Sequence, residues 1–156
     1  MGKLIILILV LVVSAPVQAV SLAQHVIVGD WLAQQVDTPW QAFAVGFISH
    51  AVLDYLPVQQ AVVDPFKPHE YGLFWGEIII AIWVLSDAVE CRKRTWGIIG
   101  ALTPDIIDGV MTVIAPDRWQ RGEHLFPWHR SRRAIRLGEY QSLGVSITLF
   151  TFWMTF

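Results

Sequence analysis

Cysteine is almost absent from this chain of 156 residues, in which Cys91 is the single example. One cysteine excludes an internal disulfide, and no Cys-His zinc-finger spacing is present. The sequence also lacks a G-x-G-x-x-G loop, a Walker sequence and a G-x-S-x-G turn. It therefore offers no serine or cysteine nucleophile arrangement on which an activity would rest.

Charged residues are scarce too, at 15% of the sequence, whereas 54% is hydrophobic and the mean hydropathy is +0.51. The length suits a single domain. The composition predicts a membrane-associated protein with membrane lipid as a partner, and it speaks against nucleic-acid binding. The oligomeric state does not follow from the sequence.

Residues 1–19 combine a basic start, an apolar run and a small-x-small pattern that ends at Ala19. This is typical of a secretory signal peptide cleaved after Ala19. An uncleaved first membrane helix is the alternative, because the apolar stretch approaches the length that a span needs. Residues 20–156 then form a single helical domain.

Several later segments have the length and composition of helices. A helix capped by Asp37 or Thr38 and starting at Pro39 is predicted to run to Leu56. Further apolar segments are residues 71–89, followed by the basic triplet 92–94, then 96–116 and 143–156. The predicted fold is an all-α bundle of about five helices, several of them membrane-associated, with 71–89 as a membrane span.

Histidine and aspartate are paired within the predicted helix that runs from Pro39 to Leu56. His50 and Asp54 are four residues apart, so on a helix they lie on one face and can converge on a metal ion. His25 sits at helical spacing among apolar residues, where it is either a hydrogen-bonded core residue or a further ligand. Glu77, inside an apolar segment, is a candidate ligand or a residue that supports one.

Two aspartates interrupt the segment 96–116. Thr103 can cap a helix that starts at Pro104, which would place Asp105 and Asp108 near its positive end without any function. Alternatively both carboxylates bind a cation, since their i, i+3 spacing puts them on a single face.

The arginine-rich segment 117–136 holds two more histidines. His124 and His129 suit a loop that directs both rings to one point, although a solvated basic loop would also contain them. Arg130 and Arg132 are candidate phosphate contacts, because a guanidinium pairs bidentately with such oxygens.

Together these residues form a pool of imidazoles and carboxylates, the ligand types that suit zinc and, alternatively, manganese. The predicted metal ligands are His25, His50, Asp54, Asp105, Asp108, His124 and His129. Such a site would activate a water for hydrolysis, with Asp54 or Asp108 as the group that takes its proton.

Three stretches resemble a known family. Gly100–Asp108 resembles the Gly-x-Leu-x-Pro-Asp-x-Asp element of the bacterial membrane-bound metal-dependent hydrolases, Gly46–Asp54 resembles their Gly-x-x-Ser-His-x-x-x-Asp helix, and Gln24–Gly29 resembles their early Thr-His-x-x-x-Gly element. That family is similar to the α-helical zinc-dependent phospholipases C. The resemblance implies an all-helical fold, a location in the bacterial cell membrane, and metal-dependent hydrolysis.

The sequence therefore predicts a membrane-associated metal-dependent hydrolase that acts on a phosphoester or lipid substrate. The alternative is a non-catalytic integral membrane protein, either a structural subunit or a metal-binding or transport module, in which the same polar residues hold helices together. A third possibility is that the apolar segments form the core of a secreted domain.

Overall fold

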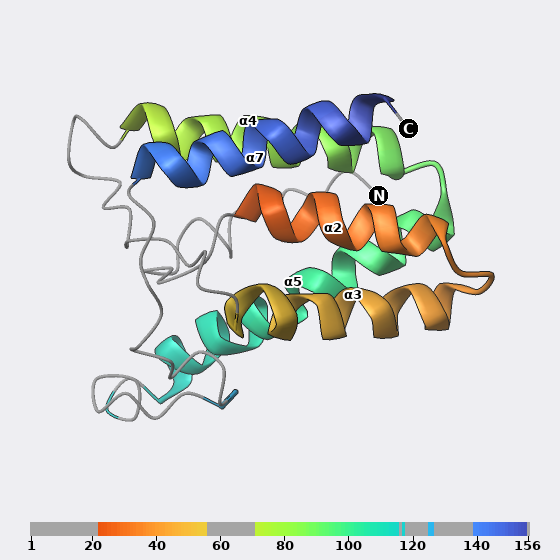
Figure 1. Cartoon of the computed structure of the whole chain (residues 1–156). Helices are drawn as coiled ribbons and strands as arrows, with labels where there is room; N and C mark the ends of the chain where they lie inside the picture. Colours follow the sequence, from red (N-terminus) through yellow and green to blue (C-terminus); the bar gives the residue numbers. More distant parts are fainter. Residues whose placement is uncertain (1–21, 56–70, 116, 118–124, 127–138, 156) are drawn as a thin grey trace.

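The computed structural model of the chain describes residues 22–55, 71–115, 117, 125–126 and 139–155. Regular secondary structure within these residues is all-helical and comprises five helices (Figure 1). They are α2 (Leu22–Gln34), α3 (Pro39–Tyr55), α4 (Tyr71–Ala88), α5 (Arg92–Ile114) and α7 (Glu139–Thr155). The prediction of an all-α bundle of about five helices is confirmed for this part of the chain.

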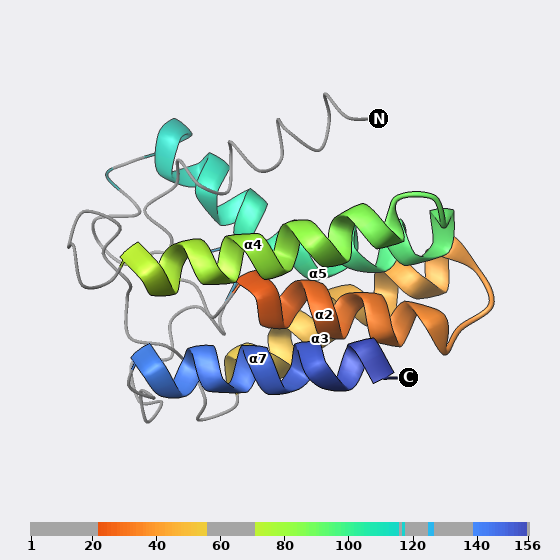
Figure 2. The ribbon, with the colours of Figure 1, turned by 90° about the horizontal axis from the view of Figure 1, so that it is seen from above.

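Helix α2 lies at the centre of the bundle. It packs against α3 and α5, which also pack against each other, while α4 and α7 contact its other side. Figure 2 shows α4 and α7 flanking α2 when the bundle is seen from above. In both views α3 and α5 run opposite to α2, so the N-terminal end of α2 and the C-terminal end of α3 lie at the same end of the bundle (Figures 1 and 2).

The start of α3 follows local rules that are visible in the sequence. The backbone N–H of Gln41 donates to Thr38 Oγ1 at 3.3 Å, and Gln41 Oε1 accepts from the backbone N–H of Thr38 at 3.0 Å. This reciprocal pair is a capping box, which satisfies donors that the first turn of a helix leaves unpaired. Pro39 occupies the first helical position, where its missing N–H costs nothing.

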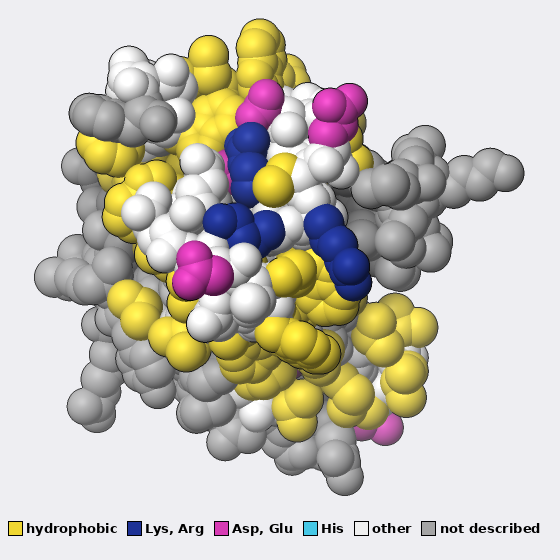
Figure 3. Space-filling view, turned by 90° about the vertical axis from the view of Figure 1, so that its right-hand side faces the viewer, with side chains coloured by type: hydrophobic (Ala, Val, Ile, Leu, Met, Phe, Trp, Pro, Cys, Tyr) yellow, Lys and Arg dark blue, Asp and Glu magenta, His cyan; other side chains and the backbone are white. Residues whose placement is uncertain are grey.

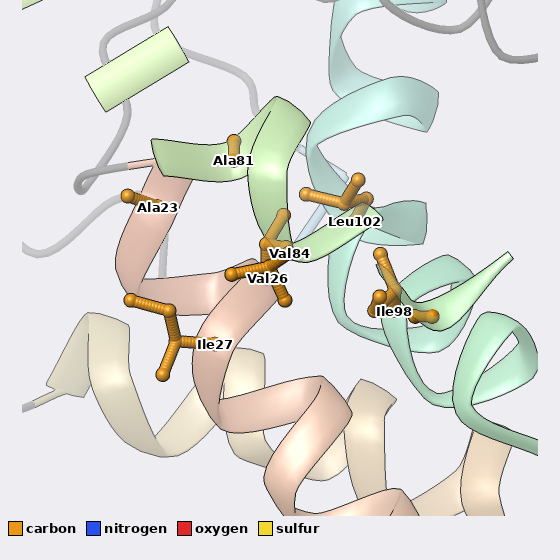
Figure 4. Packing of buried hydrophobic residues seen from close by; sticks show 8 residues of the cluster. Ala23, Val26, Ile27, Ala81, Val84, Ile98 and Leu102 are labelled. Atoms are coloured by element: carbon orange, nitrogen blue, oxygen red, sulfur yellow. The ribbon is translucent and has the colours of Figure 1, made fainter. Parts of the chain in front are cut away.

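A small apolar core joins α2, α4 and α5. Its buried members are small or β-branched residues with one leucine (Figure 4): Ala23, Val26, Ile27, Ala81, Val84, Ala88, Ile98 and Leu102. Burial of such side chains contributes about 25 cal/mol per Å² of apolar surface removed from water. This core fixes α2 against α4 and α5.

Glycines allow α3 and α5 to approach each other unusually closely. A Cβ atom built on Gly46 of α3 would lie 2.1 Å from the carbonyl oxygen of Gly97, and one on Gly100 of α5 would lie 2.1 Å from that of Phe43. No side chain larger than hydrogen fits at either position without moving a backbone. The contact therefore brings the two helix backbones themselves together.

A buried aspartate links three helices at the end of the bundle where α2 ends and α5 begins. Asp30 of α2 accepts hydrogen bonds from Arg94 Nε of α5 at 2.7 Å and from Trp153 Nε1 of α7 at 2.5 Å. Arg94 also pairs with the more exposed Asp87 of α4 at 2.8 Å. The hydrogen bond to Asp30 raises the pKa of Arg94 against the effect of burial. Figure 3 views this end, where basic and acidic side chains gather at the surface.

A second polar group connects α2, α4 and α7 near the opposite end. Ser146 Oγ donates to Glu77 Oε1 at 2.6 Å and accepts from Gln24 Nε2 at 3.3 Å. Glu77 Oε2 also accepts from the backbone N–H of Ala23, at the start of α2, at 3.3 Å. The Glu77 carboxylate thus satisfies a helix N-terminus from a neighbouring helix.

The predicted membrane spans are not found. Within the described residues no helix is long and apolar enough to cross a membrane. Helix α4 has 18 residues and contains Glu77 and Asp87, and α7 has 17 residues, whereas a span needs about 20 predominantly apolar ones. Helix α5 is longer, at 23 residues, but carries Arg92, Lys93, Arg94 and two aspartates.

The predictions of membrane-spanning helices, of membrane association and of a location in the bacterial cell membrane are therefore wrong for this part of the chain. The error came from reading apolar content as exposure to lipid. Part of this content is buried between helices, whereas Trp75, Ile79, Ile82 and Trp83 of α4 are exposed. The alternatives of a signal peptide or a first membrane helix in residues 1–19 lie outside the described residues.

Candidate metal centre

Three of the predicted ligands meet in the interior of the bundle. His25 lies on the first turns of α2, and His50 and Asp54 lie one turn apart near the end of α3. All three are buried, with exposed fractions of 0% for both histidines and 3% for Asp54. One nitrogen or oxygen atom from each lies within 4.8 Å of the others, so the group could hold a metal ion.

The carboxylate of Asp54 contacts both imidazoles. Its Oδ2 lies 3.0 Å from His50 Nε2, and its Oδ1 lies 3.5 Å from His25 Nε2. The rings of His25 and His50 are stacked, with centroids 4.1 Å apart and planes inclined by 14°. Both imidazoles therefore present an Nε2 atom to the same carboxylate.

These separations fit a metal centre. Zinc bonds to imidazole nitrogen and carboxylate oxygen are close to 2.0–2.1 Å, so neighbouring ligand atoms of a tetrahedral site lie about 3.3 Å apart. The two contacts between imidazole and carboxylate, at 3.0 and 3.5 Å, bracket this value. The three candidate ligand atoms lie within 4.8 Å of one another, so they would draw closer together around a bound ion.

The backbone of α5 fixes the orientation of His50. Its Nδ1 lies 2.6 Å from the carbonyl oxygen of Ala101, which can only accept a hydrogen bond, so Nδ1 carries the proton. The second nitrogen, Nε2, then faces Asp54. Ligating histidines typically donate their other N–H to a carbonyl or carboxylate in this way, which fixes the tautomer.

His25 has a different environment. Neither of its ring nitrogens makes a hydrogen bond within the described residues, although both are buried. The Nε2 atom has only the 3.5 Å contact with Asp54 Oδ1, and Nδ1 has no hydrogen-bond partner among the described residues. A buried polar atom without a hydrogen bond is costly and calls for an explanation such as an ion, so His25 is the residue that argues most strongly for a metal here.

The two histidines also differ in their protonation. Burial lowers the pKa of His25, and the adjacent His50 lowers it further against the opposing effect of Asp54. For His50 burial also acts to lower the pKa, but the hydrogen bond to Asp54 and the charges of Asp105 and Asp54 outweigh it and raise the pKa. The surroundings of His50 thus favour the charged imidazolium, and those of His25 favour the neutral imidazole, which is the form that binds a metal.

Asp105 extends the group towards the surface. Its Oδ1 lies 3.6 Å from His50 Nε2, and its side chain is 12% exposed. Asp108 is buried on the next turn of α5. The structure thus brings Asp105 to the three-residue group and places Asp108 one turn further along.

The alternative in which Thr103 caps a helix beginning at Pro104 is wrong. Both residues are inside α5, which begins twelve positions earlier at Arg92, and Thr103 Oγ1 donates to the carbonyl oxygen of Ile99 at 2.6 Å. Asp105 and Asp108 are therefore not near a helix N-terminus, and the positive end of a helix does not stabilise their charges.

Of the remaining predicted residues, only Glu77 lies in the described part of the chain, and it belongs to another polar group. Glu77 supports the start of α2 and bonds to Ser146, as described above. His124, His129, Arg130 and Arg132 lie outside the described residues, so their part in the site stays a prediction. Sequence reasoning missed the Ala101 carbonyl, because every residue carries this group and no sequence signal marks the one that an imidazole will contact.

Comparisons with known proteins found no relative. No family model matches the chain, and it has no significant match among the curated proteins or the solved structures. The resemblance to metal-dependent hydrolases stays a prediction. A function is therefore inferred from the chemistry of His25, His50 and Asp54.

The donor set fits a divalent transition metal. Two imidazoles and one carboxylate are the protein ligands of many catalytic zinc sites, and a fourth position is left for water or substrate. The lack of a hydrogen bond at either ring nitrogen of the buried His25, among the described residues, supplies the independent observation for this fit. The identity of the metal does not follow from these three residues, because imidazole also suits other transition metals.

Proposed function

We propose that the protein is a metal-dependent hydrolase whose metal is held by His25, His50 and Asp54. The single observation that carries the proposal is the convergence of these three buried side chains on one point. Zinc is the expected metal, with manganese as the alternative, since imidazole and carboxylate donors suit both. A phosphoester is the expected substrate class, in keeping with the family resemblance.

The residues divide into separate roles. Asp54 faces both imidazoles, so its charge offsets that of a bound cation, and His50 is held by the Ala101 carbonyl. When bound, a divalent ion would supply Lewis acidity that lowers the pKa of a water and stabilises charge on a phosphoryl oxygen. Asp105, the more exposed carboxylate beside His50, would complete the ligand set, and Asp108 would accept the proton of the attacking water.

A second candidate is a metal centre that only stabilises the fold. It is favoured by the burial of the group, since structural zinc sites are closed to solvent whereas catalytic sites keep one open position. In that case substrate would have no access, and the metal would simply hold α2 against α3. The partial exposure of Asp105 supports the catalytic alternative.

The test is the metal content of the purified full-length protein after incubation with zinc or manganese and removal of the excess. We expect about one equivalent in the wild type and a loss of binding in His50→Ala and in Asp54→Ala. Asp87→Ala, which changes an exposed carboxylate of α4, is the control and should keep its metal. A wild type that retains no metal would refute both the hydrolase and the structural-metal proposals.

Activity then separates the two candidates. The metal-loaded protein should hydrolyse a chromogenic phosphoester such as p-nitrophenyl or bis-p-nitrophenyl phosphate, and Asp108→Asn should lose this activity while retaining the metal. Metal binding without hydrolysis of any phosphoester in a broad panel would favour the structural role.

A further inference from the structure

Pro104 lies inside α5, in a place where a proline usually weakens a helix. The side chain is fully buried, so it packs within the bundle rather than marking a loop. In Figure 2 the C-terminal half of α5 diverges from the line of its first half. Bends of this kind are commonly caused by an interior proline.

The proline changes the hydrogen bonding of the preceding turn. A regular helix would supply the carbonyl of Gly100 with the N–H of residue 104, which proline lacks. The pyrrolidine ring also crowds that carbonyl and bends the helix, and such a bend would lengthen the next bond along, from Asp105 N–H to the Ala101 carbonyl. Thr103 Oγ1 bonds back to Ile99 at 2.6 Å on the same turn, which further favours a bend.

The weakened turn is the one that contacts the metal centre. His50 Nδ1 lies 2.6 Å from the Ala101 carbonyl oxygen. The close approach of α3 and α5 at Gly46 and Gly100 brings the imidazole within reach of this carbonyl. On the other side of Pro104, Asp105 places its Oδ1 3.6 Å from His50 Nε2.

We propose that Pro104 is a positioning residue of the metal centre. By interrupting the hydrogen-bond ladder of α5, it leaves the Ala101 carbonyl available to accept from His50 Nδ1–H, so that Nε2 points at Asp54 and Asp105. The proposal rests on the metal site proposed above, although its effect on His50 is measurable without any metal.

The test compares Pro104→Ala with wild type and with Pro39→Ala, which removes a proline from the first position of α3, where it breaks no helix bond. Binding of Zn²⁺ alone is measured by competition with a chromophoric chelator. We expect Pro104→Ala to weaken zinc binding by about 10- to 100-fold, the effect typical of losing a group that orients a ligand. Pro39→Ala should bind zinc as the wild type does.

Stability and tautomer distinguish positioning from simple damage to the fold. Because an alanine restores the helix bond, the thermal midpoint of Pro104→Ala should equal or exceed that of the wild type. The ring ¹⁵N shifts of His50 in metal-free protein at alkaline pH should report protonated Nδ1 in the wild type and a tautomer mixture in the variant.

Unchanged zinc affinity, or weakened affinity with an unchanged tautomer, would overturn the proposal. If Pro104→Ala does not fold, the wild type still decides, because a proton on Nε2 of His50 contradicts the proposed geometry. A wild type that binds no zinc, together with the expected tautomer mixture in Pro104→Ala, would refute the proposed function while supporting the role of Pro104.

Discussion

Arg94 forms ion pairs with two aspartates, one buried and one exposed. Comparing the two pairs therefore measures how burial changes the contribution of an ion pair to stability. The side chain of Asp30 is 0% exposed and that of Asp87 is 54% exposed. Asp30 accepts two hydrogen bonds from the guanidinium and one each from Trp153 and Gln34. Asp87 contributes a single surface contact.

We expect Asp30→Asn to lower the free energy of unfolding by about 3 kcal/mol, because it leaves a partly buried guanidinium without its main counter-charge. Asp87→Asn should lower it by about 1 kcal/mol at most, as is usual for exposed pairs. Urea denaturation followed by circular dichroism measures both. Equal losses in the two variants would show that burial does not govern this pair.

At the scale of single residues, sequence reasoning succeeded where the relevant spacing is local. The i, i+4 relation of His50 and Asp54 holds for any helix and needs no tertiary information. His25 reaches His50 and Asp54 from another helix. The sequence could suggest this only through the type of residue, because histidine is a common metal ligand. The role of Glu77 as a partner of Ser146 and of the α2 N-terminus depends on contacts between residues 69 and 54 positions apart, and the sequence does not encode those visibly.

Among the helices, the contact between α3 and α5 depends on glycine. We expect Gly46→Ala to lower the free energy of unfolding by about 3 kcal/mol, because the added methyl group would lie 2.1 Å from a backbone oxygen and must push the helices apart. Alanine has the higher helix propensity, so a helix considered alone would gain stability.

The matched control is Ala44→Leu on the exposed side of α3. A surface substitution of this kind should change stability by about 0.5 kcal/mol or less. Chemical denaturation of both variants measures the difference. Stabilisation by Gly46→Ala would mean that helix propensity outweighs the interhelical clash, contrary to the packing described here.

The helical segments were largely predictable from the sequence, whereas the surroundings of their apolar faces, lipid or other helices, were not. The Thr38 and Gln41 capping box and the proline at position 39 mark the start of α3 in the sequence. The apolar stretch of α4 was mistaken for a membrane span, because apolar length alone does not distinguish lipid from a neighbouring helix. Its buried face, with Ile78, Ala81, Val84 and Ala88, packs within the bundle instead.

For the whole molecule, metal binding should be coupled to folding. The three ligands come from two helices that only the folded chain holds together, so the folded state binds the ion far better than the unfolded chain does. At a free zinc concentration 100 times the dissociation constant, we expect the free energy of unfolding to rise by about 2.7 kcal/mol.

Thermal and urea unfolding with zinc, and again after addition of a chelator, measure this coupling. The chelator should reverse the gain, and His50→Ala should show no gain at any zinc concentration. A wild type with the same stability under all conditions would contradict the metal centre, whichever function it serves.

The sequence by itself determined the helical class of the fold, the start of α3 and the residue types suited to a metal, because capping, periodicity and i, i+4 spacing act over a few residues. Only the tertiary structure decided that His25 meets His50 and Asp54, that the Ala101 carbonyl orients one imidazole, and that the apolar helices face one another. These outcomes depend on which helices touch, and that is set by the combined packing of distant segments rather than by any one stretch.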